Sequence, residues 1–191
     1  MSNSVQKVIA LYKKVSKTNF ILINSIQSGI LLVSSDFIAQ KFVEKKEHVN
    51  LSRSLQFLTI GATFVGPFSS VFFKRLHISY ATSKQQKRNI VIQKVALDQL
   101  IFAPTLVAGM MFLKNALQGE SIEEIKLEFQ DKYVNIMQMN YSLWPFLKLF
   151  KYYFVPLHFQ VLYSQGFAFL WNIYMTWKIN CKRDVGARLE L

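Results

Sequence analysis

The sequence predicts an all-α fold, an integral membrane bundle of four transmembrane helices with an amphipathic N-terminal helix. Two observations predict it: four long stretches carry no charge, and the segments between them are rich in Lys and Arg. The chain of 191 residues is 51% hydrophobic, yet its formal net charge is +12. A disordered chain is excluded because it would not be this apolar. A nucleic-acid-binding protein would explain the charge alone, whereas apolar spans with basic loops explain both properties.

The uncharged stretches set the predicted spans. They are residues 18–35, 54–73, 99–113 and 152–177. A helix needs about 20 mostly apolar residues to cross a bilayer, so we expect spans at about 20–40, 55–73, 95–113 and 155–177. A soluble bundle would carry charge on the outer face of each helix, and these stretches carry none on any face. The predicted membrane domain is 20–180, and 181–191 form a basic C-terminal tail.

The N-terminal segment, residues 1–19, is basic and free of acidic residues. Within it, residues 5–17 place apolar side chains on one side of a helical wheel and four lysines on the other. Such a helix resembles an import-type targeting sequence without Arg. The alternative, which we favour, is an interfacial helix that precedes the first span and binds anionic lipid.

The distribution of Lys and Arg predicts an orientation. With four spans, both tails and the loop at 74–94 share one side and hold 14 basic residues, against 9 on the other side. The excess favours the cytoplasmic-type side, or the matrix in an organelle of bacterial descent, for both termini.

Polar residues inside the predicted spans are the candidate functional residues, because a polar side chain in hydrocarbon needs a partner or water. One interpretation is that they line a hydrated interior that passes small solutes or ions. The other is hydrogen bonding between helices, which we favour for Gln165 and Asn172. Helix-end positions are an alternative for Asp36 and Asp98. The candidates are Asp36, Gln40, Asp98, Gln99, His158, Gln165 and Asn172.

Catalytic and metal-binding patterns do not occur in the sequence. The three histidines lie in different segments without ligand spacing, and the single Cys181 excludes a disulfide framework and a Cys-based zinc site. No nucleophile or phosphate-loop motif is present. We therefore expect no enzymatic activity and no cofactor. The acidic run that follows Gly119 is typical of a solvated helix face, with a capping box at Ser121.

Several motifs in register resemble the Mpv-seventeen family, also called the peroxisomal membrane protein of twenty-two kilodaltons family. The matching residues cover most of the chain, from about 20 to 180. They are Asp36 with Gln40, Gly66-Pro67, Asp98-Gln99, Ala103-Pro104, Trp144-Pro145, Val155-Pro156, and Trp171-Asn172 with Tyr174. The sequence departs from the family pattern at Lys148 (Gln in the pattern), Lys151 (Asn) and Gln160 (Arg), so no role of those missing residues is carried over.

The resemblance implies a small four-span protein of the mitochondrial inner membrane or, as the alternative, the peroxisomal membrane. It implies a pore-like role in solute passage and organelle homeostasis, and in some members upkeep of mitochondrial DNA. The expected partners are the lipid bilayer and small solutes or ions, with a homo-oligomer left open and no direct contact to nucleic acid. A non-enzymatic scaffold that organises lipids or partner proteins is the alternative function.

Overall fold

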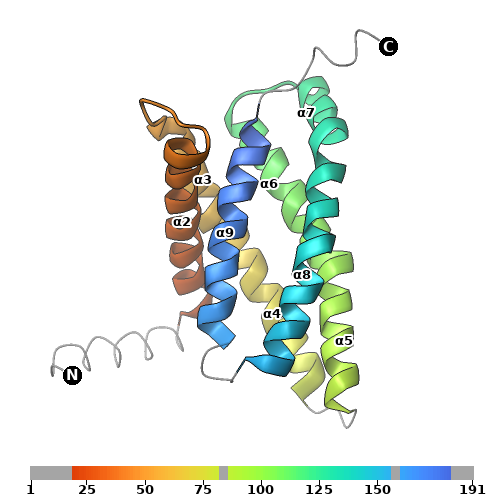
Figure 1. Ribbon diagram of the computed structural model, residues 1–191. Helices are drawn as coiled ribbons and strands as arrows, with labels where there is room; N and C mark the ends of the chain where they lie inside the picture. The colour runs from red at the N-terminus through yellow and green to blue at the C-terminus, as the bar shows by residue number, and fades with distance from the viewer. Residues whose placement is uncertain (1–18, 82–85, 156–159, 182–191) are drawn as a thin grey trace, which may run out of the picture.

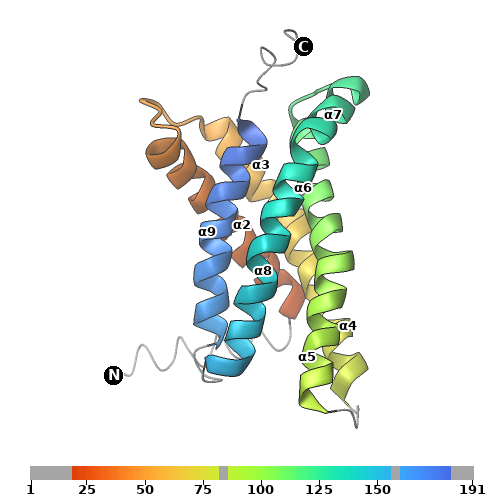
Figure 2. The same cartoon turned by 45° about the vertical axis from the view of Figure 1, so that its right-hand side comes forward.

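The computed structural model describes residues 19–81, 86–155 and 160–181, which form helices and short connections without any strand. Five long helical rods run alternately up and down (Figures 1 and 2). Their elements are α2 (Phe20–Ile38) with η1 (Ala39–Val43); α3 (Leu51–Ile60), η2 (Gly61–Val65) and α4 (Gly66–Ala81); α5 (Lys87–Leu97), η3 (Asp98–Phe102) and α6 (Ala103–Leu117); α7 (Ile122–Glu128), η4 (Phe129–Tyr133) and α8 (Val134–Phe154); and α9 (Gln160–Asn180).

The rods pack side by side in a ring, so that the first and last rods are in contact. Helix α2 contacts α3, α4 and α9, while α8 contacts α9, α5 and α6, and α6 contacts α3. We call the end of the bundle that carries Phe20, Gln86 and Val155 the lower end, and the end that carries Asn180 the upper end, as in Figure 1.

Each of the four rods that precede α9 contains a π-helical turn, η1 to η4. Two of these turns lie directly before Gly66-Pro67 and Ala103-Pro104. Proline has no N–H and crowds the carbonyl one turn earlier, so a wider turn before it lets the rod continue. The rods that contain Pro67 and Pro104 therefore stay continuous, with a π-helical turn before each proline. The other two turns carry Gln40 and Lys132, which are buried.

Two glycines let α2 approach the second rod closely. A Cβ atom added at Gly66 would lie 2.4 Å from the Cα of Ser25, and one added at Gly61 would lie 2.5 Å from the carbonyl oxygen of Ser28. Small residues are the usual means by which membrane helices bring their backbones together. The family-motif glycine Gly66 therefore has a packing role.

An apolar layer fills the middle of the bundle. Its buried residues come from all five rods and are Leu32, Phe57, Ile60, Ala103, Val107, Met110, Met111, Ile136, Met137, Trp171, Met175 and Ile179. Towards the lower end it borders Trp144, whose ring meets that of Trp171 edge to face at 6.1 Å. This layer separates the polar groups of the two ends.

Three helices among the described residues are long and apolar enough to cross a membrane: Phe20–Val43, Leu51–Tyr80 and Arg88–Leu117. They contain the first three predicted spans. The fourth predicted span, 155–177, overlaps α9, and its residues 156–159, which include Pro156 and His158, lie outside the described residues. The all-helical membrane bundle is therefore confirmed.

The rod of residues 122–154 was expected only at its start, because the segment between the third and fourth predicted spans was counted as a connection. It begins at the expected capping box, in which Ser121 and Glu124 exchange hydrogen bonds. This extra rod makes the number of described rods odd, so Phe20 and Asn180 lie at opposite ends of the bundle (Figure 1). The prediction that both tails share one side concerns the faces of a membrane, and it stays a prediction.

Candidate functional site

Asp36 is the centre of a buried polar cluster near the upper end. Its side chain is fully buried, and Arg53 donates from Nε to Asp36 Oδ1 over 2.8 Å. The other carboxylate oxygen, Oδ2, accepts from Ser54 Oγ at 2.7 Å and from Gln40 Nε2 at 2.8 Å. Both oxygens of this buried carboxylate are therefore satisfied.

Arg53 joins this cluster to the loop that follows η1. Its guanidinium forms a two-bond pair with Glu44, at 2.8 and 2.6 Å. Burial acts to raise the pKa of Glu44, but the hydrogen bonds from Arg53 and Lys46 outweigh it and lower that pKa below its ordinary value. Gln40 also accepts the backbone N–H of Asn50 at 2.7 Å. We call Asp36, Gln40, Glu44, Arg53 and Ser54 the Asp36 cluster.

A second set of buried charges lies at the same end, between α6, η4 and α9. Glu128 receives Lys132 Nζ at 3.0 Å and Lys114 Nζ at 3.4 Å, and Lys114 lies 3.5 Å from Glu120. Lys132 also donates to the carbonyl oxygen of Ile179 at 2.6 Å. A polar cavity of about 480 Å³ is lined by these residues together with Arg53 and Asn50. We call it the upper cavity.

Asp98 lies at the other end of the apolar layer, where η3 begins. Its side chain is 4% exposed and forms an ion pair with Lys148 of α8 through Oδ2. The same oxygen accepts from Gln99 Nε2 at 2.7 Å. One turn further along α8, Lys151 Nζ donates to Ser164 Oγ of α9 at 3.2 Å. We call Asp98, Gln99, Lys148, Lys151 and Ser164 the Asp98 cluster.

Hydrogen bonding in the Asp98 cluster is incomplete. Asp98 Oδ1 and Gln99 Oε1 are buried and have no hydrogen-bond partner among the described residues. The same holds for Oδ1 of Asn140, which lies two turns above Lys148 on α8. A buried acceptor without a partner costs about 1–3 kcal/mol. The Lys148 side chain, 17% exposed, lies over the Trp144 ring at the border of the apolar layer. The Asp98 cluster therefore has unused capacity to accept hydrogen bonds.

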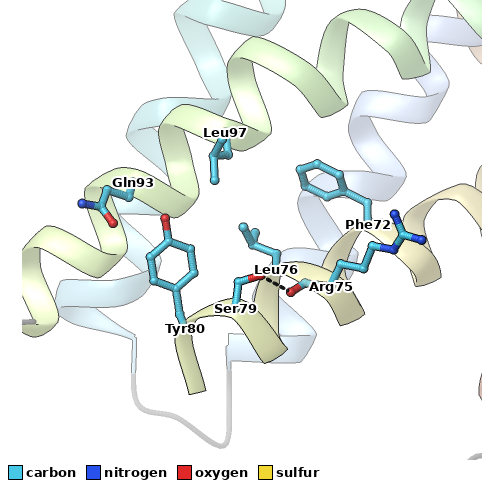
Figure 3. Close-up of a pocket in the computed structure, with 7 residues that line it drawn as sticks. All are labelled: Phe72, Arg75, Leu76, Ser79, Tyr80, Gln93 and Leu97. Atoms are coloured by element: carbon cyan, nitrogen blue, oxygen red, sulfur yellow. Dashed lines mark hydrogen bonds between the residues drawn. The ribbon is translucent and has the colours of Figure 1, made fainter. Parts of the chain in front are cut away.

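A groove of about 530 Å³ lies between α4 and α5 at the lower end (Figure 3). Arg75, Ser79 and Tyr80 line it from α4, and Gln93 and Leu97 line it from α5. The ammonium of Lys94 lies 5.4 Å from the centroid of the Tyr80 ring. Leu97 directly precedes Asp98, so the groove borders the turn that carries the Asp98 cluster.

The structure separates the sequence candidates into groups. Asp36 and Gln40 lie in one buried cluster, and Asp98 and Gln99 lie in another. Asn172 is half-buried, Gln165 is exposed on α9 and does not face the interior, and His158 lies outside the described residues. No group of metal-ligating side chains occurs in the part of the chain that the structure describes.

Sequence reasoning missed the basic partners of the two carboxylates. Arg53 was expected in a loop just before a span, and Lys148 and Lys151 in a loop beyond the membrane. The spacing of the two lysines was the available signal, because residues 140, 144, 148 and 151 recur on one face of a helix. The surrounding apolar residues of α8 would then have marked an inward-facing polar stripe.

Comparisons with known proteins identify relatives of this chain. The family model described as "Mpv17 / PMP22 family" matches residues 115–176. The chain is 34% identical to the mitochondrial inner membrane protein Mpv17 of Drosophila melanogaster, over 82% of this chain and 94% of that protein. It is also 34% identical to the human protein of the same name, over 79% and 85%.

A more distant relative, PXMP2/4 family protein 2 of Dictyostelium discoideum, is 25% identical over 90% of this chain and 91% of its own length. No solved structure matches the chain. The relatives' names, the matched length and the apolar helices place this multi-pass protein in the mitochondrial inner membrane, as expected. The chain belongs to the Mpv17 / PMP22 family.

Proposed function

We propose that this protein is a non-enzymatic channel or permeability protein that passes small solutes or ions across its membrane. The observation that carries the proposal is the pair of polar regions inside the bundle. The upper cavity lies at one end and the Asp98 cluster at the other, with the apolar layer between them. Polar and charged groups inside a membrane domain commonly mark the path of a solute.

The unsatisfied acceptors of the Asp98 cluster support a hydrated path. Asp98 Oδ1, Gln99 Oε1 and Asn140 Oδ1 lie along the interface of α8 with the third rod, and each is buried without a partner. Such groups are far less costly when water or a polar solute supplies the missing bond. In a bundle whose polar groups serve only to join the helices, we would expect each buried acceptor to have a partner in another helix.

The apolar layer supports a closed state of this path. Val107 and Met111 are 1% and 0% exposed, and Ile136 faces them from α8 within the same cluster. A narrow apolar segment excludes water and blocks ions even where no side chain fills the path completely. Opening requires a small separation of the rods, and the flexible methionine side chains of the layer can adapt to it.

The rod of residues 122–154 is part of the proposed membrane domain. At 1.5 Å per residue it is about 50 Å long, which exceeds the thickness of a bilayer. Its outward face exposes Phe146, Phe150 and Phe154, while Asn140 and Lys148 face the interior. We therefore propose five crossing rods instead of four, with the basic lower end in the matrix.

The topology is tested by tags placed at each terminus of the chain in isolated mitochondria whose outer membrane has been opened. We expect protease to reach the C-terminal tag and not the N-terminal one. Tags on the same side would contradict five crossings and would support the original count of four.

The proposed partners follow from this role. They are the lipid bilayer and the solutes or ions that pass. Self-association into a homo-oligomer is a further alternative. Homeostasis of the organelle would depend on the solute passed, and any effect on mitochondrial DNA would be indirect, without contact to nucleic acid.

Conductance in planar bilayers tests the proposed function directly. Purified protein is expected to give single-channel currents, and Met111→Ser, which makes the apolar layer more polar, is expected to raise the open probability. Phe112→Ser, which changes an exposed neighbour, is the matched control and leaves the open probability unchanged. Absence of current from folded wild-type and Met111→Ser proteins would contradict the proposal and favour the alternative, a membrane scaffold.

A further inference from the structure

The geometry points to anions as the solutes that the Asp98 cluster selects. This inference rests on the proposed function and deepens it, since it assigns the sign of charge that passes the lower end. It follows from the ionisable groups that α5, η3, α8 and α9 bring together there.

Two lysines and one carboxylate make up the charge of the Asp98 cluster, so its net charge is +1. Asp98 forms its ion pair with Lys148, and Lys151 lies one helical turn further towards the lower end. Both lysines are held inside the bundle: Lys148 is paired with Asp98 and stacked over Trp144, and Lys151 is hydrogen-bonded to Ser164 on α9. An ion on this path therefore meets fixed ammonium groups instead of freely moving surface side chains.

The approach from the lower end has the same sign. Lys74, Arg75, Arg88 and Lys94 lie around it, and Asp98 is the one acidic side chain among the described residues of this end. Arg75 lines the groove between α4 and α5, and in Figure 3 it extends along the same side of the groove as Phe72. Basic groups at the entrance of a path concentrate anions and repel cations.

The upper end does not share this property. The Asp36 cluster carries −1 from Asp36, Glu44 and Arg53, and Lys46, which pairs with Glu44 from outside the cluster, balances it. Beside it, Lys114 and Lys132 balance Glu120 and Glu128. Because charge separation costs more away from bulk water, a fixed net charge in a narrow interior decides ion selectivity more strongly than the same charge on a surface. Selectivity is therefore assigned to the Asp98 cluster.

The unsatisfied acceptors fit a hydrated anion. Lys148 and Lys151 supply N–H donors to the anion, while Asp98 Oδ1 and Gln99 Oε1 can accept hydrogen bonds from the water that it carries. A bare cation would gain one carboxylate oxygen but would face both ammonium groups.

The zero-current potential in a potassium chloride gradient across a planar bilayer tests the inference. For the wild-type protein, we expect a zero-current potential close to the equilibrium potential of chloride. The double variant Lys148→Gln with Lys151→Asn changes the net charge of the cluster from +1 to −1. Its zero-current potential is expected to move towards the equilibrium potential of potassium. These substitutions install the residues of the family pattern at both positions, so they suit the fold.

Two further variants sharpen the test. Asp98→Asn raises the cluster to +2 and is expected to increase the preference for chloride. Lys126→Gln removes an exposed lysine from α7 at the upper end and is the matched control, with an unchanged potential. Circular dichroism and monodisperse elution establish that each variant is folded.

The outcomes separate the inference from the proposed function. Currents whose zero-current potential is the same in the wild type and the double variant would overturn the inference and leave solute passage standing. Currents that prefer potassium in the wild type would also overturn it. No current from any folded variant would overturn the proposed function itself.

Discussion

Asp36 and Asp98 are two buried aspartates, each hydrogen-bonded to a nearby glutamine and paired with a basic side chain from another rod. Around Asp36 every carboxylate oxygen has partners, and Arg53 connects it to a second carboxylate, Glu44. Around Asp98 one carboxylate oxygen and the Gln99 amide oxygen have none. The residue types are similar, but the completeness of their hydrogen bonding differs.

This difference distinguishes a structural from a functional polar cluster. A complete network in a low-dielectric interior holds its members in one arrangement, whereas an incomplete one leaves groups that can exchange partners. The Asp36 cluster fixes α2 to α3 and α9 through Arg53, which reaches the carbonyl oxygen of Thr176 at 3.5 Å. The Asp98 cluster can instead bind water or a solute, and stability measurements can test that distinction.

The largest expected effect comes from removing the cation of each cluster. Arg53→Met leaves Asp36 and Glu44 close together without their shared partner and is expected to cost about 3–5 kcal/mol of unfolding free energy. Lys148→Met is expected to cost less than half as much, because Lys151 and the partly open lower end still compensate Asp98. Thermal unfolding in detergent measures both.

Equal losses in these two variants would contradict the distinction, because they would make the Asp98 cluster as structural as the Asp36 cluster. Lys126→Met, at an exposed position of α7, is the control for loss of a lysine. Its unfolding temperature should equal that of the wild type.

The glutamines give a smaller effect in the same direction. Gln40 bonds Asp36, Ser54 and the backbone of Asn50, so Gln40→Leu is expected to cost about 2–3 kcal/mol through the partners left unsatisfied. Gln99→Leu removes one hydrogen bond and one unsatisfied oxygen and is expected to cost about 1 kcal/mol or less. A greater loss for Gln99→Leu would show that the structure around Asp98 is the more tightly constrained of the two.

The comparison also explains what could be predicted from the sequence. The uncharged stretches gave three spans, and the positions of Asp36 and Asp98 within them marked both clusters. Their partners were missed for different reasons. Arg53 lies in the first turn of a helix that begins at Leu51, before the predicted start at residue 55. Lys148 belongs to a rod whose apolar sequence is interrupted by Lys148 and Lys151, so that segment was not counted as a span. Pairing between distant rods has no local signal in a single sequence.

The smallest expected effect concerns pH and the Asp36 cluster alone. The pKa of Glu44 is lowered in the folded protein, so its contribution to stability is present above the unfolded pKa of about 4.3 and is lost as the pH falls through the lower folded value. Because Glu44 is partly exposed, the contribution is expected to be under about 1 kcal/mol. Glu44→Gln should flatten the acid limb of a plot of unfolding temperature against pH, while Glu47→Gln, at an exposed position of the same loop, should not. An unchanged acid limb in Glu44→Gln would mean that Arg53 stabilises the upper end through Asp36 only.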